Sequence, residues 1–194
     1  MLVGFMGLIG SGKSVSAQYL VDNYEFVERP FAEPLKRGCK ELFLLTDDQL
    51  FGTQEQKATA DPRWFNTTPR RIMQYVGTDL FRNNIENLFP GLEGNFFTHA
   101  FKIWYQEQIA LEPKLCVVIS DVRFQNEVDM IHELGGSVIK INRNCTPAVG
   151  ISTAHSSETE MNKIKSVDYE ILNNKTTDDL YKKIDEIISD IGTI

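Results

Sequence analysis

The sequence predicts an α/β fold in which helices cover both faces of a parallel sheet. Short apolar, β-branched segments alternate with helical segments along the chain, which is typical of parallel strands joined by crossover helices. A glycine-rich segment stands directly between the first apolar segment and the first helical one. The 194 residues are 42% hydrophobic and 24% charged, which suits a single domain with a core of ordinary size.

The first elements lie on either side of the glycine-rich segment. Leu2–Met6 (LVGFM) is a short apolar run and predicts a buried strand. Ser14–Asn23 follows with apolar residues at helical spacing, so a helix begins where the glycines end. Tyr24–Phe31 predicts a second strand, and Pro34 opens a further helical stretch.

The middle of the chain is helical but more often interrupted. Residues 46–69 are polar and broken by glycine and proline, which predicts a loop with short helices. Pro69 suits the first position of a helix over 69–85, and a second helix is expected from about 95 to 111. The helix over 69–85 is expected to carry an apolar stripe of Ile72, Tyr75, Val76 and Leu80.

The last third returns to alternating strands and helices. Leu115–Ser120 (LCVVIS) is a continuous apolar run that ends at Asp121, and it predicts a fully buried strand. An amphipathic helix is expected over 126–135, closed by two glycines. Two further strands and a closing helix are expected at Ser137–Asn142, Tyr169–Asn174 and Thr176–Ile191.

The charge of the chain argues against a nucleic acid polymer as its ligand. The net charge is −7, whereas proteins that grip a polyanionic backbone usually show a basic excess or a basic stripe. A small anionic ligand fits better, because the few arginines lie in or near motif-like segments. These arginines are Arg70, Arg71, Arg82, Arg123 and Arg143.

The sequence predicts a cytoplasmic protein that does not enter a membrane. No apolar run reaches the length of a transmembrane helix, and the N-terminus lacks the layout of a signal peptide. The three cysteines, Cys39, Cys116 and Cys145, are widely spaced. They suit neither a disulfide framework nor a zinc site, so we expect reduced thiols.

The glycine-rich segment Gly7–Ser14 (GLIGSGKS) fits the pattern G-x-x-x-x-G-K-[ST]. Its glycines let backbone N–H groups turn toward phosphate oxygens, and the following helix offers its positive N-terminus. Lys13 is expected along the β- and γ-phosphates of a nucleotide, and the Ser14 hydroxyl is expected to hold Mg²⁺. The phosphate-binding residues predicted from this segment are Gly10, Ser11, Gly12, Lys13, Ser14 and Val15.

Two residues after the buried strand are candidates for the chemistry beside this loop. Asp121 would lie at the carboxyl edge of the sheet, where ligands bind in open α/β folds. It could hold Mg²⁺ through water or contact the acceptor; capping the next helix is the structural alternative. Arg123 lies at the same edge, and its fork of donors matches the oxygens of a migrating phosphoryl group.

The segment Asn173–Asp179 (NNKTTDD) tests whether the chain could be a guanine-specific GTPase. A guanine-reading element needs N-K-x-D, and this segment is one residue too long. It stands at the start of the closing helix, where its threonines and aspartates look like a helix cap. We take the cap interpretation.

The segment 119–143 (ISDVRFQNEVDMIHELGGSVIKINR) resembles the corresponding block of the viral (phage-type) deoxynucleoside monophosphate kinases. Four shorter segments resemble the same family in the same order: FAEPLK (31–36), QYVGTDLFR (74–82), AFKIW (100–104) and HSSE (155–158). Together with the glycine loop, these segments span nearly the whole chain.

The resemblance implies a nucleoside-monophosphate-kinase-like P-loop fold in a single domain over 1–194. Its core would be 1–36 and 113–194, with a helical monophosphate-binding insertion at about 37–112 and a lid at about 142–158. The implied reaction is ATP + dNMP → ADP + dNDP with Mg²⁺. The implied partner is therefore a small-molecule deoxynucleoside monophosphate, in the host cytoplasm if the chain is viral.

The resemblance also implies roles for individual residues. Asp121 and Arg123 would lie between the two nucleotides, and Arg143 would form or flank the lid. This lid holds a single arginine, which leaves open whether Arg123, Lys13 and Mg²⁺ together stabilise the migrating phosphoryl group. The residues implied around the monophosphate are Lys36, Arg70, Gln74, Thr78 and Asp79.

Two aromatic or titratable residues have both a functional and a structural interpretation. Phe31, at a strand end, could stack on a base. His155 could contact a nucleotide or belong to the cap of a following helix.

Two other functions stay open beside the monophosphate kinase. Dephospho-coenzyme A kinases have a similar opening, but their Asp-x-Pro-Leu-Leu-x-Glu stretch is not found here. A P-loop ATPase or switch protein would bind nucleotide without transfer to a small acceptor. The sequence names neither the base nor the sugar preference, and it leaves a homodimer as one option for the oligomeric state.

Overall fold

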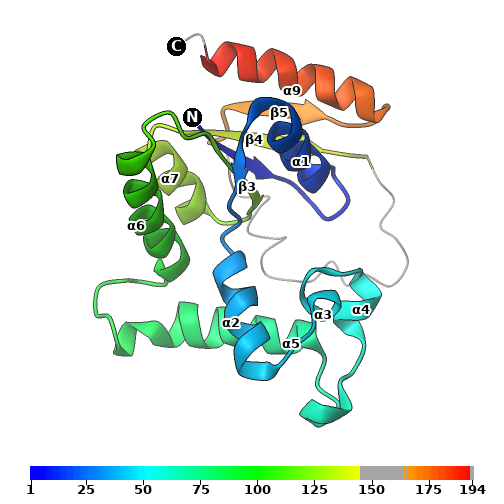
Figure 1. Ribbon diagram of the computed structural model, residues 1–194, viewed down its shortest axis with the longest axis vertical. Coiled ribbons are helices and arrows are strands. Elements are labelled where there is room, and N and C mark those ends of the chain that lie inside the picture. Colours follow the sequence, from blue (N-terminus) through cyan, green and yellow to red (C-terminus); the bar gives the residue numbers. More distant parts are fainter. Residues whose placement is uncertain (145–163, 165, 193–194) are drawn as a thin grey trace. The chain divides into compact units, whose positions relative to one another are not determined.

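The computed structural model describes residues 1–144, 164 and 166–192, and the chain divides into two compact units (Figure 1). The first unit comprises Met1–Pro30 and Lys102–Ile194, and the second comprises Phe31–Phe101. The expected division into a core and a helical insertion at about 37–112 stays a prediction. At the two ends of the second unit, the rings of Phe31 and Phe101 pack edge-on at 5.3 Å.

The first unit is built on a five-stranded sheet in the order β2-β3-β1-β4-β5. All four pairings are parallel, as the alternation of elements predicts. The strands are β1 (Leu2–Met6), β2 (Val27–Glu28), β3 (Val117–Val122), β4 (Ser137–Asn142) and β5 (Tyr169–Leu172).

The edge strand β2 is much shorter than the expected strand over Tyr24–Phe31. Glu25 adopts a left-handed conformation, with φ of 57°, at the end of the preceding helix. Pro30 lacks the N–H that a longer ladder would need. Only Val27 and Glu28 therefore pair with β3.

Helices cover both faces of this sheet. α1 (Lys13–Tyr24) and α9 (Thr177–Gly192) lie on one face, and α7 (Gln125–Glu133) lies on the other. The last part of α6 (Phe96–Leu111) is tied to α7 by an ion pair of 2.6 Å between Lys102 and Glu133.

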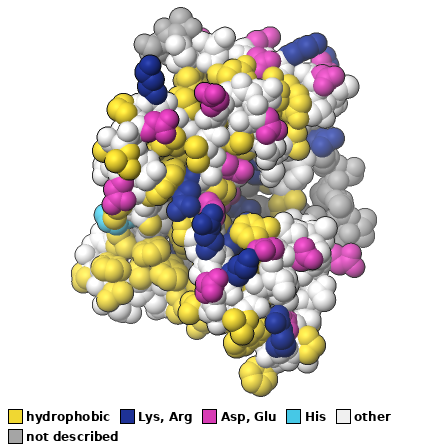
Figure 2. All heavy atoms as spheres, in the orientation of Figure 1, with side chains coloured by type: hydrophobic (Ala, Val, Ile, Leu, Met, Phe, Trp, Pro, Cys, Tyr) yellow, Lys and Arg dark blue, Asp and Glu magenta, His cyan; other side chains and the backbone are white. Residues whose placement is uncertain are grey.

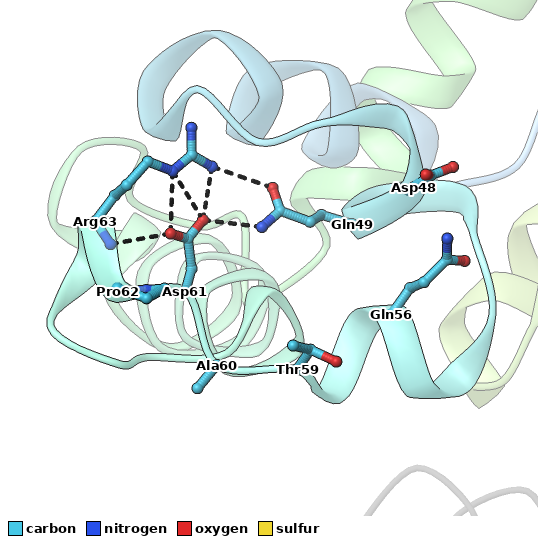
Figure 3. Close-up of a pocket in the computed structure, with 8 residues that line it drawn as sticks. All are labelled: Asp48, Gln49, Gln56, Thr59, Ala60, Asp61, Pro62 and Arg63. Atoms are coloured by element: carbon cyan, nitrogen blue, oxygen red, sulfur yellow. Dashed lines mark hydrogen bonds and ion pairs between the residues drawn. The ribbon is translucent and has the colours of Figure 1, made fainter.

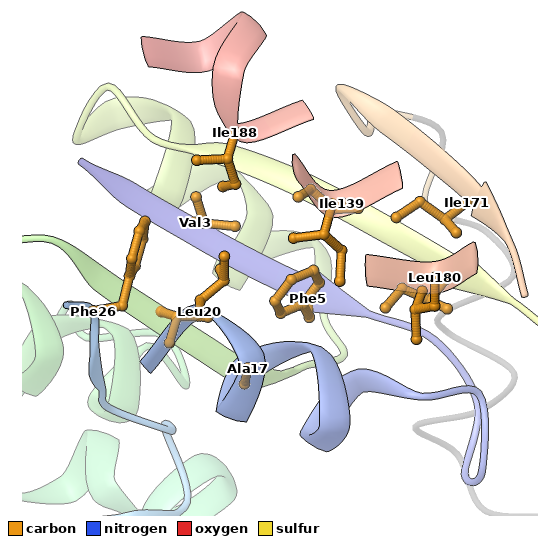
Figure 4. Close-up of a cluster of buried hydrophobic side chains, with 12 residues drawn as sticks. Val3, Phe5, Ala17, Leu20, Phe26, Ile139, Ile171, Leu180 and Ile188 are labelled. Atoms are coloured by element: carbon orange, nitrogen blue, oxygen red, sulfur yellow. The ribbon is translucent and has the colours of Figure 1, made fainter. Parts of the chain in front are cut away.

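The main core lies between the sheet and the face formed by α1 and α9 (Figure 4). Val3 and Phe5 of β1 are fully buried there. On the opposite face, a Cβ at Gly4 would lie 2.6 Å from the Ile131 side chain. Glycine in the central strand therefore lets α7 pack close to the sheet. Helical side chains in the main core include Ala17, Leu20, Leu180, Ile184 and Ile188.

The second unit is helical, with a smaller core of Cys39, Leu45, Leu50, Ile72 and Val76. Its elements are α2 (Glu33–Phe43), α3 (Asp47–Phe51), α4 (Gln54–Ala58), η1 (Pro62–Trp64), α5 (Pro69–Gln74), η2 (Tyr75–Asn84), η3 (Ile85–Asn87) and the start of α6.

The helix expected over 69–85 changes its winding after Gln74. α5 begins at Pro69, with the Thr68 side chain as its cap, but η2 is π-helical. A π-helix repeats at i→i+5 rather than i→i+4, so the apolar stripe predicted from the α-helical period is partly wrong. Ile72 and Val76 are buried, whereas Tyr75 is 58% and Leu80 is 42% exposed.

The short helices expected within 46–69 are confirmed and have a clear local cause. Thr46 and Gln49 form a reciprocal capping box at the start of α3. Thr53 and Gln56 form a second one at the start of α4. Each box satisfies two backbone N–H groups that a helix start otherwise leaves without partners.

Among the described residues, no helix combines the length and apolar character needed to cross a bilayer. Figure 2 shows Asp and Glu side chains interspersed with Lys and Arg on the visible face.

Candidate active site

The glycine loop joins β1 to α1 and has the geometry of a phosphate cradle. Gly12 caps α1 with φ of 115°, a conformation that residues with a Cβ rarely adopt. A Cβ there would also lie 2.7 Å from Asn173 Nδ2. Because the cap is glycine, no cap side chain bonds the first amides of α1. Helix N-termini whose first amides lack a side-chain cap are suited to bind an anion.

Lys13 lies across its own loop. Its Nζ donates hydrogen bonds to the carbonyl oxygens of Gly7, at 2.7 Å, and Leu8, at 2.8 Å. The ammonium group therefore adds a full positive charge to the partial charge of the α1 N-terminus. A phosphate at this place would meet both.

The loop is anchored from the end of β5. The side-chain amide of Asn173 is buried and donates a 2.9 Å hydrogen bond to the carbonyl oxygen of Ser11. The Ser11 hydroxyl is itself buried and, among the residues that the structure describes, has no hydrogen-bond partner. A buried, unpaired polar atom is uncommon outside functional sites. The sequence predicts Asn173 only as part of the last strand, so its bond to the loop is a finding of the structure.

A β-bulge places Asp121 at the carboxyl edge of β3. Gly4 pairs with Ile119 and Met6 pairs with Val122, so β3 holds one more residue than β1 over this stretch. Bulges re-aim side chains and are frequent beside active sites. Asp121 lies within β3, and the cap of α7 is Phe124. The helix-capping alternative for Asp121 is therefore wrong.

Glu127 holds the backbone of Arg123 in place directly after β3. Its carboxylate accepts hydrogen bonds from the backbone N–H groups of Arg123, at 2.7 Å, and Phe124, at 3.1 Å. Glu127 is only 2% exposed. A buried carboxylate that accepts two amides is a strong anchor, because charge-assisted hydrogen bonds are the stronger ones.

Arg143 reaches the glycine loop from the end of β4. Its Nη1 lies 3.4 Å from the carbonyl oxygen of Gly10 and donates to it. The carboxyl edge of the sheet thus carries the loop after β1, Asp121 in β3 and Arg143 after β4. This is the edge where open α/β sheets bind their ligands.

The second unit gathers three cations. Arg70 of α5 hydrogen-bonds the side chain of Gln54, and the Lys36 ammonium lies 4.9 Å from the centre of the Phe51 ring. Burial lowers the pKa of the Lys57 ammonium, and the nearby positive charges of Lys36 and Arg70 lower this pKa further. Within the described part of the chain, none of the three forms an ion pair with Asp or Glu.

Comparison with known proteins decides the family. A family model described as deoxynucleotide monophosphate kinase matches residues 46–184. The chain belongs to this family. It is therefore a kinase, a phosphotransferase that acts on nucleotides, as the resemblance in the sequence predicts.

A viral relative supports the same assignment. The chain is 54% identical over 184 residues to a protein of Acanthamoeba polyphaga mimivirus named "Putative deoxynucleotide monophosphate kinase". The match covers 95% of this chain and 94% of the relative.

A solved structure shows the fold. The dephospho-CoA kinase from Campylobacter jejuni matches with a TM-score of 0.52 and 17% identity, over 100% of this chain and 98% of that one. At this identity the match confirms the predicted P-loop kinase fold and says nothing of the acceptor. The family match favours the monophosphate kinase over the dephospho-coenzyme A kinase and over a switch protein.

The kinase presents the remaining predicted substrate residues along α5 and η2. Gln74 is the last residue of α5, and Thr78 and Asp79 follow in the π-helical turn. Gln74 and Thr78 are exposed, and Asp79 is half-buried. In a π-helix Asp79, not Thr78, lies one turn beyond Gln74. Their contacts with a monophosphate stay predictions.

Of the two residues with both a functional and a structural interpretation, Phe31 is described by the structure and His155 is not. Phe31 is 5% exposed and packs on Phe101, which is the environment of a core aromatic. Its stacking on a base stays a prediction. His155 and most of the expected lid over 142–158 lie outside the described residues.

A hollow of about 390 Å³ in the second unit has a structural explanation (Figure 3). Asp61 is buried and accepts hydrogen bonds from the Arg63 guanidinium and the Gln49 amide. The Arg63 and Gln49 side chains hold the pKa of the Asp61 carboxyl well below its usual range. The hydrogen bonds of Asp61 join α3, through Gln49, to the segment after α4. Arg63 lines the hollow but is already paired with Asp61, so it is not available to bind a phosphate there.

Sequence reasoning missed Asn173, Glu127 and Lys57. A signal for Lys57 was present, because the two T-x-x-Q patterns at Thr46–Gln49 and Thr53–Gln56 are capping-box signatures. They would have predicted α4 and a lysine on it. A local signal was also present for Glu127, because it stands three residues after the cap residue Phe124, as in a capping box. Nothing local marks Asn173, whose partner Ser11 is distant in sequence.

Proposed function

We propose that the kinase transfers the γ-phosphoryl group of ATP to the 5′-phosphate of a deoxynucleoside monophosphate, giving ADP and dNDP. The observation that carries this proposal is the open N-terminus of α1, inside a complete glycine loop and beside the Lys13 ammonium. Such an arrangement suits the β- and γ-phosphates of a nucleoside triphosphate. Family membership supports the monophosphate as the acceptor.

The residues of the first unit bind and polarise the donor. Gly10–Val15 would hold the ATP phosphates, and Lys13 would balance charge on the β- and γ-oxygens. Ser14 and Asp121 would hold Mg²⁺, which would supply positive charge beside the phosphates. Few protein ligands are needed, because Mg²⁺ in kinase sites takes most of its ligands from phosphate and water.

The chemical step asks little of the protein beyond position and charge. The acceptor phosphate is already ionised at neutral pH, so no general base is required. Positive groups must instead offset the repulsion between the two phosphates and stabilise the migrating group. Arg123, fixed by Glu127, and Arg143, at the Gly10 carbonyl oxygen, are the cations that we assign to this task.

The second unit would bind the acceptor. Lys36 and Arg70 would take the monophosphate group, with Gln74, Thr78 and Asp79 beside it. Arginine presents a planar fork to phosphate oxygens, and lysine adds a point charge. These substrates are free nucleotides, so we place the reaction in the cytoplasm, that of the host if the chain is viral.

An ADP-release assay tests the proposal. Mg-ATP is combined in turn with each common and modified dNMP and NMP, with Lys13→Ala as the paired variant. We expect release that depends on one or a few dNMPs and disappears in the variant. Release that is the same with and without every monophosphate would overturn the proposal. Dephospho-coenzyme A would then be the next acceptor to test.

A further inference from the structure

The short helix α4 carries two polar side chains on the face toward the acceptor cations. Gln54 and Lys57 are three residues apart, and residues at this spacing lie on the same face of a helix. Gln54 Oε1 accepts a hydrogen bond from Arg70. The face of α4 that carries Lys57 is therefore turned toward α5 and Arg70.

The three cations of this cluster form a charge arrangement that favours an anion. Lys57 is half-buried and is close enough to Lys36 and Arg70 for their charges to act on its ammonium group. Like charges that act on one another where water is partly excluded cost free energy as long as no anion is bound. Among residues 1–144, 164 and 166–192 no carboxylate pairs with any of them, although the whole chain holds 27 Asp and Glu.

The surrounding structure holds the cluster in advance of any ligand. The capping box of Thr53 and Gln56 fixes the start of α4. After the end of α4, Asp61 is held by hydrogen bonds from Arg63 and Gln49 (Figure 3). Phe51 of α3 supports the Lys36 ammonium by a cation–π contact. A site organised in this way loses little conformational entropy when it binds its ligand.

We propose that Lys57 binds the phosphate of the acceptor together with Lys36 and Arg70, and that Gln54 positions Arg70 for this contact. The inference deepens the proposed function and rests on it. A 5′-monophosphate carries nearly two negative charges at pH 7 and offers three acceptor oxygens. One fork-shaped guanidinium and two lysine ammonium groups match that charge and shape.

The decisive variants are Lys57→Met, Lys57→Arg and a matched control, Lys40→Met. Lys40 is a lysine of the same unit whose ammonium pairs with Asp47 at the surface. In steady-state assays, we expect Lys57→Met to raise the KM for the dNMP at least about tenfold. The KM for ATP should stay constant, Lys57→Arg should recover most of the loss, and Lys40→Met should change neither KM.

Two variants of Gln54 test its positioning role separately from the role of Lys57. Gln54→Ala frees the Arg70 guanidinium, whereas Gln54→Glu gives it a competing carboxylate. We expect the KM for the dNMP to rise in both variants, more in Gln54→Glu, with kcat less affected. Equal values for Gln54→Glu and the unmodified kinase would overturn the positioning role.

Equilibrium binding distinguishes failure of this inference from failure of the proposed function. Thermal unfolding is followed with added dNMP as the probe, in the presence of saturating ADP so that the glycine loop is occupied. We expect the dNMP to stabilise the unmodified kinase and Lys40→Met, and to stabilise Lys57→Met much less. Equal stabilisation of Lys57→Met and the unmodified kinase would overturn the role of Lys57, whether or not any monophosphate supports ADP release.

Discussion

The phosphate sites that we propose in the two units of this kinase are built in different ways. In the first unit the proposed site is mainly backbone: a glycine loop, the amides at the start of α1 and the carboxyl ends of parallel strands. In the second unit the proposed site is made of side chains, those of Lys36, Lys57 and Arg70 from three helices. A backbone site requires particular conformations, whereas a side-chain site requires particular charges. The predictions below test this difference.

The largest effect is expected from Lys13→Ala. The ammonium is the one side-chain charge at the mouth of the loop that the motif specifies, so its loss should lower kcat/KM about 10²- to 10³-fold. Stability should change little, because the Lys13 bonds to Gly7 and Leu8 are made at a largely exposed loop. Enzyme assays and thermal unfolding measure the two effects, with Lys182→Ala on α9 as the control. A variant that keeps most of its activity contradicts the cradle assignment.

The next effect is expected from Glu127→Ala. Two buried amides, those of Arg123 and Phe124, would lose their acceptor. The free energy of unfolding should fall by about 1–3 kcal/mol, and kcat should fall because Arg123 is no longer fixed. Urea denaturation and steady-state kinetics measure these changes. Glu133→Ala removes a surface carboxylate of the same helix and should have neither effect.

Two glycine substitutions compare the units directly. Gly12→Ala should destabilise the first unit and weaken ATP binding, because φ is 115° and Asn173 leaves no room for a Cβ. Gly38→Ala lies inside α2, where a Cβ meets nothing within 4 Å. It should stabilise the second unit by about 0.5–1 kcal/mol. Urea denaturation of both variants checks the opposite signs, and two changes of the same sign would contradict the comparison.

The smallest effect is expected from pH, with opposite directions in the two units. A hydrogen bond to Asp185 raises the pKa of Tyr24, in the first unit, to about 12. The folded state therefore favours the protonated phenol, and this stabilisation is present below pH 10 and lost as pH rises through about 12. The pKa of Asp61, in the second unit, is lowered, so its stabilisation is present above pH 3.8 and lost as pH falls.

The two tryptophans make this pH comparison measurable. Trp64 lies in the second unit and Trp104 in the first. Trp104→Phe leaves fluorescence to report acid unfolding of the second unit, and Trp64→Phe leaves it to report alkaline unfolding of the first. We expect Tyr24→Phe to reduce the alkaline dependence in the first unit only. An unchanged alkaline profile in Tyr24→Phe would contradict the assignment.

The first unit was largely predictable because its pattern is local. β4 occupies the predicted residues, and the glycine loop stands between β1 and α1 as expected. Such strands are buried on both faces, so their apolar runs are continuous and easy to recognise. Asp121 was placed at the correct edge, but the bulge in β3 was not predicted. It arises from register between two strands that are distant in sequence.

The second unit was predictable only in part. The polar segment over 46–69 was correctly predicted to contain short helices, but the π-helical winding of η2 displaced the predicted stripe. Lys36, Lys57 and Arg70 come from three separate helices. The residue spacing within one segment therefore does not predict that these side chains lie near one another.

The sequence by itself determined the parallel α/β fold, the phosphate loop and the order of the catalytic candidates along the chain. Each of these depends on residue type and local spacing, which a single segment contains. Tertiary structure alone decided that Asn173 anchors the loop and that Lys57 lies near enough to Lys36 and Arg70 for their charges to act on it. Burial and like-charge repulsion act through space, so their consequences appear only when distant segments are packed together.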